Sequence, residues 1–308
     1  MSAPIHIPSA INSSLQRVLP YCAEQLKEWL AKSQNAAPLR DISYALGTPP
    51  DFSKPELCLF YMLRYYSAYI TEYYYIYHTI LKHLPSSIDV TCIGHGSLLD
   101  AVSLSIACDE EAKTYHYHGY DITNWAFTLM NQILQLPGSS FTPHITDACS
   151  ENIFTGNEDC IIFAKSISHF SNSQLSQLGY AMNLTTWNKQ KLFVVSSNRT
   201  QEHTYSQDAE KIRFFCSLSR THNIPQNPFY SFSGQNTALS ITKEFLWNFF
   251  YGLDIPRDPL SFTADIFSYC NSFRSNHKHC DNSCTNTHFR PLLKLMHLNF
   301  EIFELTRK

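Results

Sequence analysis

Two glycines and an acid are spaced as in a site for a nucleotide cofactor. The turn Gly94-His95-Gly96-Ser97 follows an apolar run, and Asp121 ends the next strand-like run of the chain. A glycine turn that leads from a strand into a helix presents backbone N–H groups and the positive helix end to a ligand, and glycine allows close approach. An acid at the end of the second strand can accept hydrogen bonds from ribose hydroxyls. The spacing therefore predicts that Gly94 and Gly96 contact a cofactor whose ribose Asp121 holds.

Residues beside the turn extend this predicted site. Ser97 is expected to cap the following helix, with Asp100 at the third position, and Ile122 or Trp125 would cover an adenine. His95 could contact the cofactor, act as a base or be a hydrogen-bonded structural residue. Because the turn lacks the third glycine of the dinucleotide fingerprint, a tight strand-to-helix turn without a ligand is the alternative.

Polar residues follow the strongest later strand, which is predicted over residues 159–164. Lys165, Ser166 and His169 are the candidate catalytic residues, because open α/β sheets place their sites at the carboxyl ends of strands. In the alternative interpretation, the serine caps a turn and the histidine lies on the surface. Residues 197–199 (Ser197-Asn198-Arg199), after the next strand, are a second candidate for the substrate site.

An aromatic helix is predicted before the glycine turn, over about residues 55–84. Its aromatic side chains lie on most faces, which indicates a helix packed between other elements. Its tyrosines are expected in the core with their hydroxyls at the rim. Alternatively, the face around Tyr65, Tyr66 and Tyr69 lines the cofactor or substrate pocket, with Tyr69 as the candidate cofactor contact.

Strand-like and helix-like segments alternate along the chain, which predicts an α/β fold with a parallel sheet covered on both faces. A helix over 11–32 comes first, with Pro20 expected to kink or divide it. Alternating polar and apolar residues over 296–302 are typical of an antiparallel edge strand with one wetter face. The expected organisation is an N-terminal helical segment over 1–86 and a sheet domain over 87–308. The other strands are expected at 88–93, 114–120, 143–149, 159–164, 191–195 and near 227–235, and the other helices at 98–107, 123–136, 172–182, 206–218 and 241–253.

Composition limits the classes of protein that the chain can belong to. It has 308 residues, of which 44% are hydrophobic and 16% are charged, and its net charge is −3. This apolar share supports a sizeable core and excludes a disordered chain. The net charge argues against a protein whose whole surface binds polyanions.

Arg64 and Glu72 lie in the most apolar segment, and a membrane-spanning helix needs about 20 nearly uncharged apolar residues. No membrane span is therefore predicted.

The ten cysteines indicate a reducing compartment. The sequence starts without a basic stretch followed by an apolar run, so no secretory signal is recognised, and reduced thiols in the cytoplasm are expected. The segment Cys270–Cys284 carries metal-ligand residue types at irregular spacing. A reduced cysteine-rich loop is expected there, structural zinc and a disulfide are the alternatives, and no metal site is predicted.

The chain resembles class I S-adenosylmethionine-dependent methyltransferases over roughly residues 55–200 and the C-terminal strand, and more narrowly a poorly characterised branch of them. The resemblance is carried by the aromatic run at 65–74, I-G-H-G-S-L-L-D at 93–100, Y-D-I-T-N-W at 120–125 and I-I-F-A-K-S-I-S-H-F at 161–170. It implies a Rossmann-like, doubly wound, mostly parallel sheet of seven strands with an antiparallel last strand. It also implies that the glycines of the turn lie against the methionine and ribose of the cofactor, and that residues 165–169 lie where the substrate enters.

The sequence also differs from the typical pattern of these methyltransferases. His95 replaces the small or cysteine residue common in that turn, Leu98 stands where a third glycine is frequent, and the strand before Lys165 lacks the N/D-P-P-Y motif of amino-group DNA methyltransferases. Methyl transfer from a sulfonium needs an aligned nucleophile in a dry pocket, and a general base only if that nucleophile is protonated. The absence of a strong catalytic motif is therefore compatible with this chemistry.

The sequence is compatible with three functions. The leading hypothesis is a cytoplasmic transferase that moves a methyl group from S-adenosylmethionine to an unidentified acceptor (RNA, protein or small molecule), with the helical segment capping the cofactor site. The second is a non-catalytic methyltransferase-like protein that binds a protein partner in a larger assembly. The third is a nicotinamide oxidoreductase, which shares the acid at Asp121 but is expected to have the fuller glycine fingerprint.

Overall fold

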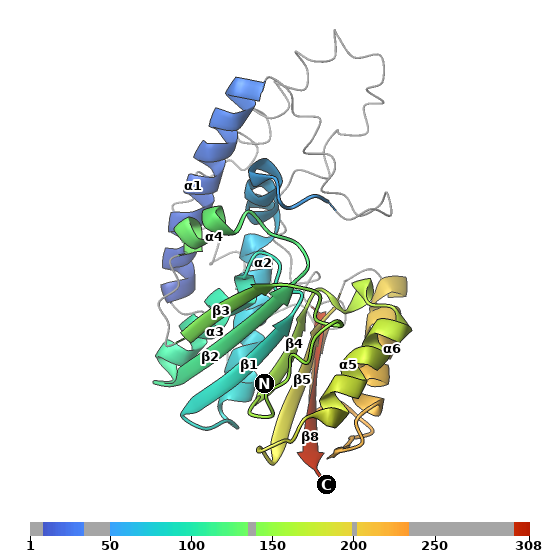
Figure 1. Ribbon diagram of the computed structural model, residues 1–308. Coiled ribbons are helices and arrows are strands. Elements are labelled where there is room, and N and C mark those ends of the chain that lie inside the picture. Colours follow the sequence, from blue (N-terminus) through green and yellow to red (C-terminus); the bar gives the residue numbers. More distant parts are fainter. Residues whose placement is uncertain (1–8, 34–49, 135–139, 199–201, 234–298) are drawn as a thin grey trace. The chain divides into compact units, whose positions relative to one another are not determined.

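The computed structural model describes residues 9–33, 50–134, 140–198, 202–233 and 299–308 (Figure 1). The chain forms two compact units. In the described part, the first contains residues up to 68 and residues 124–134, and the second contains residues 69–123, 140–198, 202–233 and 299–308. The boundary predicted after residue 86 stays a prediction.

The first unit is helical. It contains α1 (Ser9–Ser33), the first half of α2 (Pro55–Leu81) and α4 (Phe127–Leu134). Pro55 begins α2, where its missing N–H costs no helical hydrogen bond. No helix in the described part of the chain is long and apolar enough to cross a membrane.

Helix α1 follows the predicted amphipathic pattern. Leu15, Val18 and Leu26 are fully buried, because residues at this spacing lie on one side of a helix. Pro20 lies inside α1 and is exposed, and the helix continues through it. The proline therefore does not divide the helix, and the side chain of Leu30 lies outside the described residues.

The second unit is built on an eight-stranded sheet with the order β3-β2-β1-β4-β5-β8-β6, and β7 pairs with β8. Strands β1 to β5 are parallel, and the C-terminal strand β8 is antiparallel to β5. The predicted α/β class and the antiparallel last strand are confirmed. The strands are β1 (Ser87–Ile93), β2 (Thr114–Asp121), β3 (Ser140–Ile145), β4 (Cys160–Ala164), β5 (Lys191–Ser197), β6 (His222–Asn223), β7 (Tyr230–Ser233) and β8 (Asn299–Arg307).

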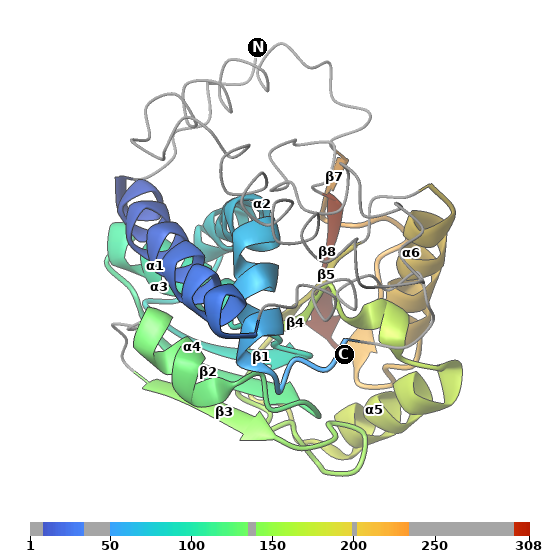
Figure 2. The ribbon, with the colours of Figure 1, turned by 90° about the horizontal axis from the view of Figure 1, so that it is seen from above.

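Helices cover both faces of this sheet, with α3 on one face and α5 and α6 on the other (Figures 1 and 2). On the first face, Tyr117 of β2 meets Asp100 of α3. On the other face, Ile161 and Phe163 of β4 form one buried cluster with residues of α5 and α6. The helices of this unit are α3 (Leu99–Glu110), the short 3-10 helix η3 (Ile167–His169), α5 (Asn172–Leu184), α6 (Glu202–Ser217) and the second half of α2.

The prediction that the C-terminal strand is an edge strand with a wetter face is wrong. Strand β8 lies between β5 and the short strands β6 and β7, so its backbone pairs with neighbouring strands on both sides. Its polar residues Asn299 and Glu301 are buried. The Asn299 amide donates to Glu72, and Glu301 forms an ion pair with Arg213, and the alternation in the sequence does not distinguish such a buried face from a solvated one.

The expected cap of α3 is also wrong. The N-cap residue is Leu98, which has a φ of 62° and offers no side-chain hydrogen bond, so Ser97 precedes the cap position. A non-glycine residue in this left-handed conformation is strained, and such strain is found preferentially near functional sites. The helix predicted over 241–253 and the cysteine-rich segment 270–284 lie outside the described residues.

Candidate functional site

The sheet register places the glycine turn beside the acid of β2. Ile93 at the end of β1 pairs with Tyr120 of β2, so the next residues on both strands, Gly94 and Asp121, leave the sheet as neighbours. The amide of Gly94 donates to the carbonyl of Tyr120 over 2.7 Å, and the amide of Gly96 donates to Asp121 Oδ2 over 2.9 Å. The glycine turn and the acid predicted from sequence are therefore joined directly.

Glycine is required at position 94 for two reasons. Its φ is +77°, a conformation that side chains rarely adopt, and a Cβ placed there would lie 2.4 Å from Cβ of Ser166. The Ser166 hydroxyl donates to the carbonyl of Ile93. The start of the turn is thus packed against the segment that follows β4, which leaves no space for a side chain.

Asp121 retains acceptor capacity. Its Oδ2 accepts from Gly96, and its Oδ1 accepts from the amide of Thr123 over 2.8 Å. A carboxylate offers about four lone-pair sites, so one remains on each oxygen, as a vicinal diol requires. Ile122 is 75% exposed and Ile145, which pairs with Asp121 across the strands, is 53% exposed. Uncovered apolar surface thus lies beside the acid.

His95 is buried under the turn. It is 4% exposed, its Nδ1 lies 3.0 Å from the carbonyl of Gly96, and its Nε2 is buried without a hydrogen-bond partner among the described residues. A Cβ at Gly119 would lie 2.9 Å from Cδ2 of His95, so the glycine in β2 makes room for the ring. This geometry agrees with one of the roles proposed from the sequence for His95, that of a hydrogen-bonded structural residue.

Asp100 lies beneath the same turn, in the first turn of α3. It is fully buried, and its Oδ2 accepts from the hydroxyl of Tyr117 over 2.9 Å and from that of Tyr77 over 3.5 Å. Burial raises the pKa of Asp100, against the lowering effects of Cys92, Tyr117 and His95. Its carboxylate therefore contacts side chains of β2 and α2.

Lys165 is held in a buried ion pair at the carboxyl end of β4. Its ammonium lies 2.9 Å from a carboxylate oxygen of Glu72, donates to the carbonyl of Asn198, and stands 5.1 Å from the centre of the Tyr69 ring. Burial lowers the pKa of Lys165 while the charge of Glu72 raises it. The backbone of Lys165 has a φ of +60°, a strained conformation for this residue type.

Glu72 joins three strands to α2. Its Oε1 accepts from Lys165, from the hydroxyl of Ser197 over 2.8 Å and from the amide of Asn299 over 3.4 Å. Burial raises the pKa of Glu72, and the Lys165 charge lowers it. Sequence reasoning missed this role, although an acid inside an otherwise apolar helix signals a buried partner.

The three candidate catalytic residues differ in what they can still do. The Lys165 ammonium and the Ser166 hydroxyl are both engaged with other groups, and both residues are more buried than His169, which ends η3 and is exposed. Of the residues 197–199, Ser197 bonds to Glu72 and the Asn198 side chain is buried, and its Nδ2 has no partner within the part of the chain that the structure describes. Arg199 lies outside the described residues.

Other predicted aromatic contacts belong to the helical unit. Trp125 stacks on Phe52 with ring centres 3.8 Å apart, and the hydroxyl of Tyr66 lies 2.5 Å from that of Ser14. Tyr65 lies under the guanidinium of Arg64. Tyr66 is therefore a core residue, as expected for most tyrosines of this helix, and the adenine contact of Trp125 stays a prediction.

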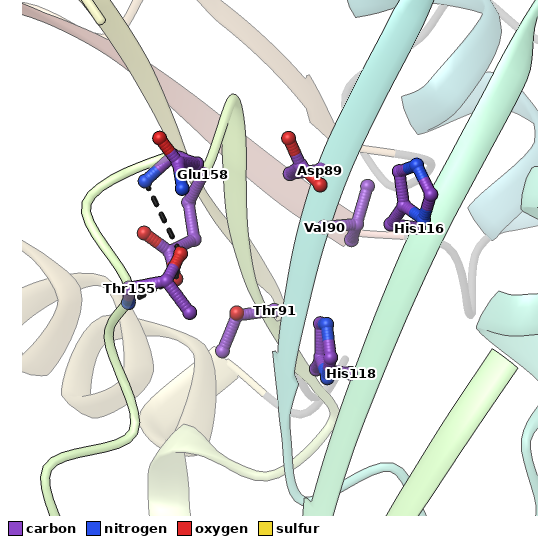
Figure 3. Close-up of a pocket in the computed structure, with 8 residues that line it drawn as sticks. Asp89, Val90, Thr91, His116, His118, Thr155 and Glu158 are labelled. Carbon is purple, nitrogen blue, oxygen red and sulfur yellow. Dashed lines mark hydrogen bonds between the residues drawn. The ribbon is translucent and has the colours of Figure 1, made fainter. Parts of the chain in front are cut away.

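A polar pocket lies elsewhere on the sheet, over the middle of β1 and β2 (Figure 3). Its volume is about 260 Å³. The connection from β3 to β4, residues 146–159, contains no helix, which leaves polar side chains on this part of the sheet. None of the predicted site residues lines this pocket, whose lining residues are Asp89, Val90, Thr91, His116, His118, Thr155, Asn157 and Glu158.

Comparisons with known proteins find similarity only at the level of structure. No protein-family model and no curated protein matches the sequence. Phosphoethanolamine N-methyltransferase 2 of Haemonchus contortus, in complex with S-adenosyl-L-methionine, is 12% identical with a TM-score of 0.42, over 77% of this chain and 56% of that one. This chain thus covers less than two thirds of that protein.

Two further solved structures show the same level of similarity. Magnesium protoporphyrin IX methyltransferase from Synechocystis PCC 6803 is 11% identical with a TM-score of 0.39, over 93% of this chain and 97% of that one. Geranyl diphosphate C-methyltransferase from Streptomyces coelicolor A3(2) is 8% identical with a TM-score of 0.40, over 76% of each chain.

The sheet order carries the fold assignment. Five parallel strands in the order β3-β2-β1-β4-β5 are followed by the antiparallel C-terminal strand β8, which lies next to β5. Helices cover both faces, and the glycine turn follows the central strand β1. The chain therefore has the class I methyltransferase-like, Rossmann-like fold that the sequence resemblance implies.

Proposed function

We propose that the protein binds S-adenosylmethionine at the glycine turn and transfers its methyl group to an acceptor. The observation that carries this proposal is the bond between the amide of Gly96 and the carboxylate of Asp121, which fixes the acid beside the turn. Asp121 would accept from the ribose hydroxyls with its remaining lone pairs. Gly94 and Gly96 would let the methionine part approach the backbone, and Ile122 would lie against the adenine.

The residues at the turn fit the cofactor. The acid has spare acceptors, the turn has no side chain at two positions, and exposed apolar surface adjoins the acid. When bound, the cofactor supplies an electrophilic methyl group on a sulfonium. The chain would align the acceptor at the ends of β4 and β5 and exclude water there. The acceptor, whether RNA, protein or small molecule, and a cytoplasmic location are part of this proposal.

A second function is a cofactor-binding or partner-binding protein without catalysis. It is favoured by the engagement of Lys165 with Glu72 and of Ser166 with the carbonyl of Ile93. Neither group is free to act as a general base. Methyl transfer to a nucleophile that is already unprotonated needs no such base, so this observation limits the acceptors without excluding catalysis.

Calorimetric titration tests the proposal. S-adenosylmethionine, S-adenosylhomocysteine and NAD would be titrated into the protein and into Asp121→Ala, with Asp109→Ala, an exposed acid at the end of α3, as the matched control. We expect micromolar binding of the first two ligands, lost in Asp121→Ala and kept in the control. Because Asp121 also binds two backbone amides, Ile122→Asp provides a second variant at an exposed position.

The outcomes separate the functions. Binding of NAD alone would indicate that the protein is a nicotinamide oxidoreductase. Folded protein that binds none of the three ligands would overturn the proposal and favour a partner-binding scaffold. Binding of the sulfonium cofactor and its product would justify a search for acceptors with isotope-labelled methyl groups.

A further inference from the structure

Asp100 is a buried acid in the helix that follows the glycine turn. It lies in the first turn of α3, and none of its surface is exposed. One carboxylate oxygen accepts from Tyr117 and Tyr77, and the other, Oδ1, has no hydrogen-bond partner in the described part of the chain. A buried carboxylate with an unsatisfied oxygen is costly when ionised, so its presence calls for a functional reason.

The groups that face Asp100 come from every element packed around it. They are Cys92 of β1, His95 of the turn, Tyr117 of β2, Tyr73 and Tyr77 of α2 and Cys160 of β4. Burial raises the pKa of each of these tyrosines and cysteines, so they stay neutral. No lysine or arginine side chain is among them.

The charge state of Asp100 is therefore sensitive to a new positive charge at the turn. Burial raises the pKa of its carboxyl above the ordinary value, and the positive end of α3 opposes this. A cation brought to the turn would add to the helix end and favour the ionised form. In the low-dielectric interior, the electrostatic attraction between a cation and a carboxylate acts over several ångströms.

We propose that Asp100 makes the site prefer the positively charged sulfonium cofactor over its neutral thioether product. This inference rests on the proposed function. Cofactor and product differ by the methyl group and by one unit of charge at sulfur, so uncharged contacts distinguish them weakly. The buried carboxylate interacts with that charge without touching it, which favours the substrate form and release of the product.

The proposal predicts a proton linkage. If the sulfonium favours ionised Asp100, binding of S-adenosylmethionine releases a proton at a pH where the free protein holds Asp100 protonated. Binding of S-adenosylhomocysteine releases none from this group. The affinity for the sulfonium, relative to the thioether, therefore rises with pH until Asp100 is ionised in the free protein, and then levels off.

Calorimetry in buffers of different ionisation enthalpy measures this proton directly. S-adenosylmethionine and S-adenosylhomocysteine would be titrated between about pH 5 and about pH 8 into the protein, Asp100→Asn and the exposed control Asp109→Asn. We expect the buffer-dependent heat for the sulfonium only. We also expect the affinity ratio of the two ligands to fall about tenfold in Asp100→Asn and to stay unchanged in the control.

A second variant keeps the test decisive if Asp100→Asn does not fold. Tyr117→Phe removes a hydrogen bond from the ionised carboxylate, so the pH range of proton release should move upward while both ligands still bind. If both ligands bind with the same buffer dependence, and the ratio is unaffected by these variants, this inference is wrong and the proposed function stands. If neither ligand binds to folded protein, the proposed function itself fails.

Discussion

At the glycine turn, steric room decides which residue can occupy position 94. The backbone there has a positive φ, and Ser166 occupies the space that a side chain would need. The sequence predicted the turn from two nearby glycines in a chain with only nine. It did not show that one of them is required by packing against a segment far along the chain, because such contacts have no local signature.

We expect Gly94→Ala to destabilise the protein by about 3 kcal/mol, from the left-handed backbone and the overlap with Ser166. Urea unfolding monitored by circular dichroism would measure this. The double variant Gly94→Ala/Ser166→Gly removes the overlapping Cβ and should recover part of the loss relative to Ser166→Gly alone. Equal losses in the two backgrounds would contradict the steric explanation.

Some residue roles could be predicted from a local sequence pattern, and others could not. The pairing of Gly96 with Asp121 follows from strand ends that adjoin in a parallel sheet. In contrast, Lys165 was predicted as catalytic from its place after a strand, and the structure shows its ammonium bound to Glu72. That partner lies on α2, and its identity depends on how the helix packs on the sheet.

At the scale of elements, Glu72 fastens α2 to three strands. Its carboxylate accepts hydrogen bonds from the first backbone amide of β8, from the hydroxyl of Ser197 in β5 and from the ammonium of Lys165, which follows β4. A buried carboxylate with this many partners is a crosslink within the sheet unit.

We expect Glu72→Gln to destabilise the protein by about 3–5 kcal/mol, because the Lys165 ammonium is left buried without a countercharge. Chemical denaturation would measure the loss. Glu56→Gln, in the first turn of the same helix, is the control and should cost much less. The double variant Glu72→Gln/Lys165→Met should be more stable than Glu72→Gln alone, and no such recovery would argue against the ion pair.

The elements themselves were largely predictable. Strands β1, β4 and β5 contain apolar runs, because central strands of a covered parallel sheet are buried on both faces, whereas β2 alternates between buried aromatic and more exposed polar residues. The position of β8 was not predictable in this way. Its alternating pattern suggested an edge strand, whereas pairing with β6 and β7 makes it internal, and strand order depends on contacts between distant segments.

At the scale of the whole molecule, three histidines are expected to make the protein sensitive to acid. Burial lowers the pKa of His78, His144 and His222 below the ordinary value. The folded protein therefore binds protons on these groups less readily than the unfolded chain. Their contribution to stability is complete above the unfolded pKa of about 6.5 and is lost as the pH falls through the folded pKa.

We expect the urea midpoint to fall between about pH 7.5 and about pH 5.5, with a smaller fall in His222→Gln. His222 is 1% exposed and its Nδ1 lies within 3.1 Å of the hydroxyls of Ser219 and Thr221. The exposed His169→Gln serves as the control. A midpoint that does not change over this range, or the same pH dependence in all three proteins, would contradict the assignment to these buried and half-buried histidines.

The sequence by itself determined the α/β class, the parallel core strands, the glycine turn and the acid that pairs with it. These features arise from local periodicity and from strand ends that a parallel sheet brings to one edge. Only the tertiary structure decided that Lys165 is neutralised by Glu72, that Asp100 is buried under the turn, and that the C-terminal strand is internal. The physical reason is that partner, burial and strand order are set by contacts between residues far apart in the chain, which leave no pattern within any one segment.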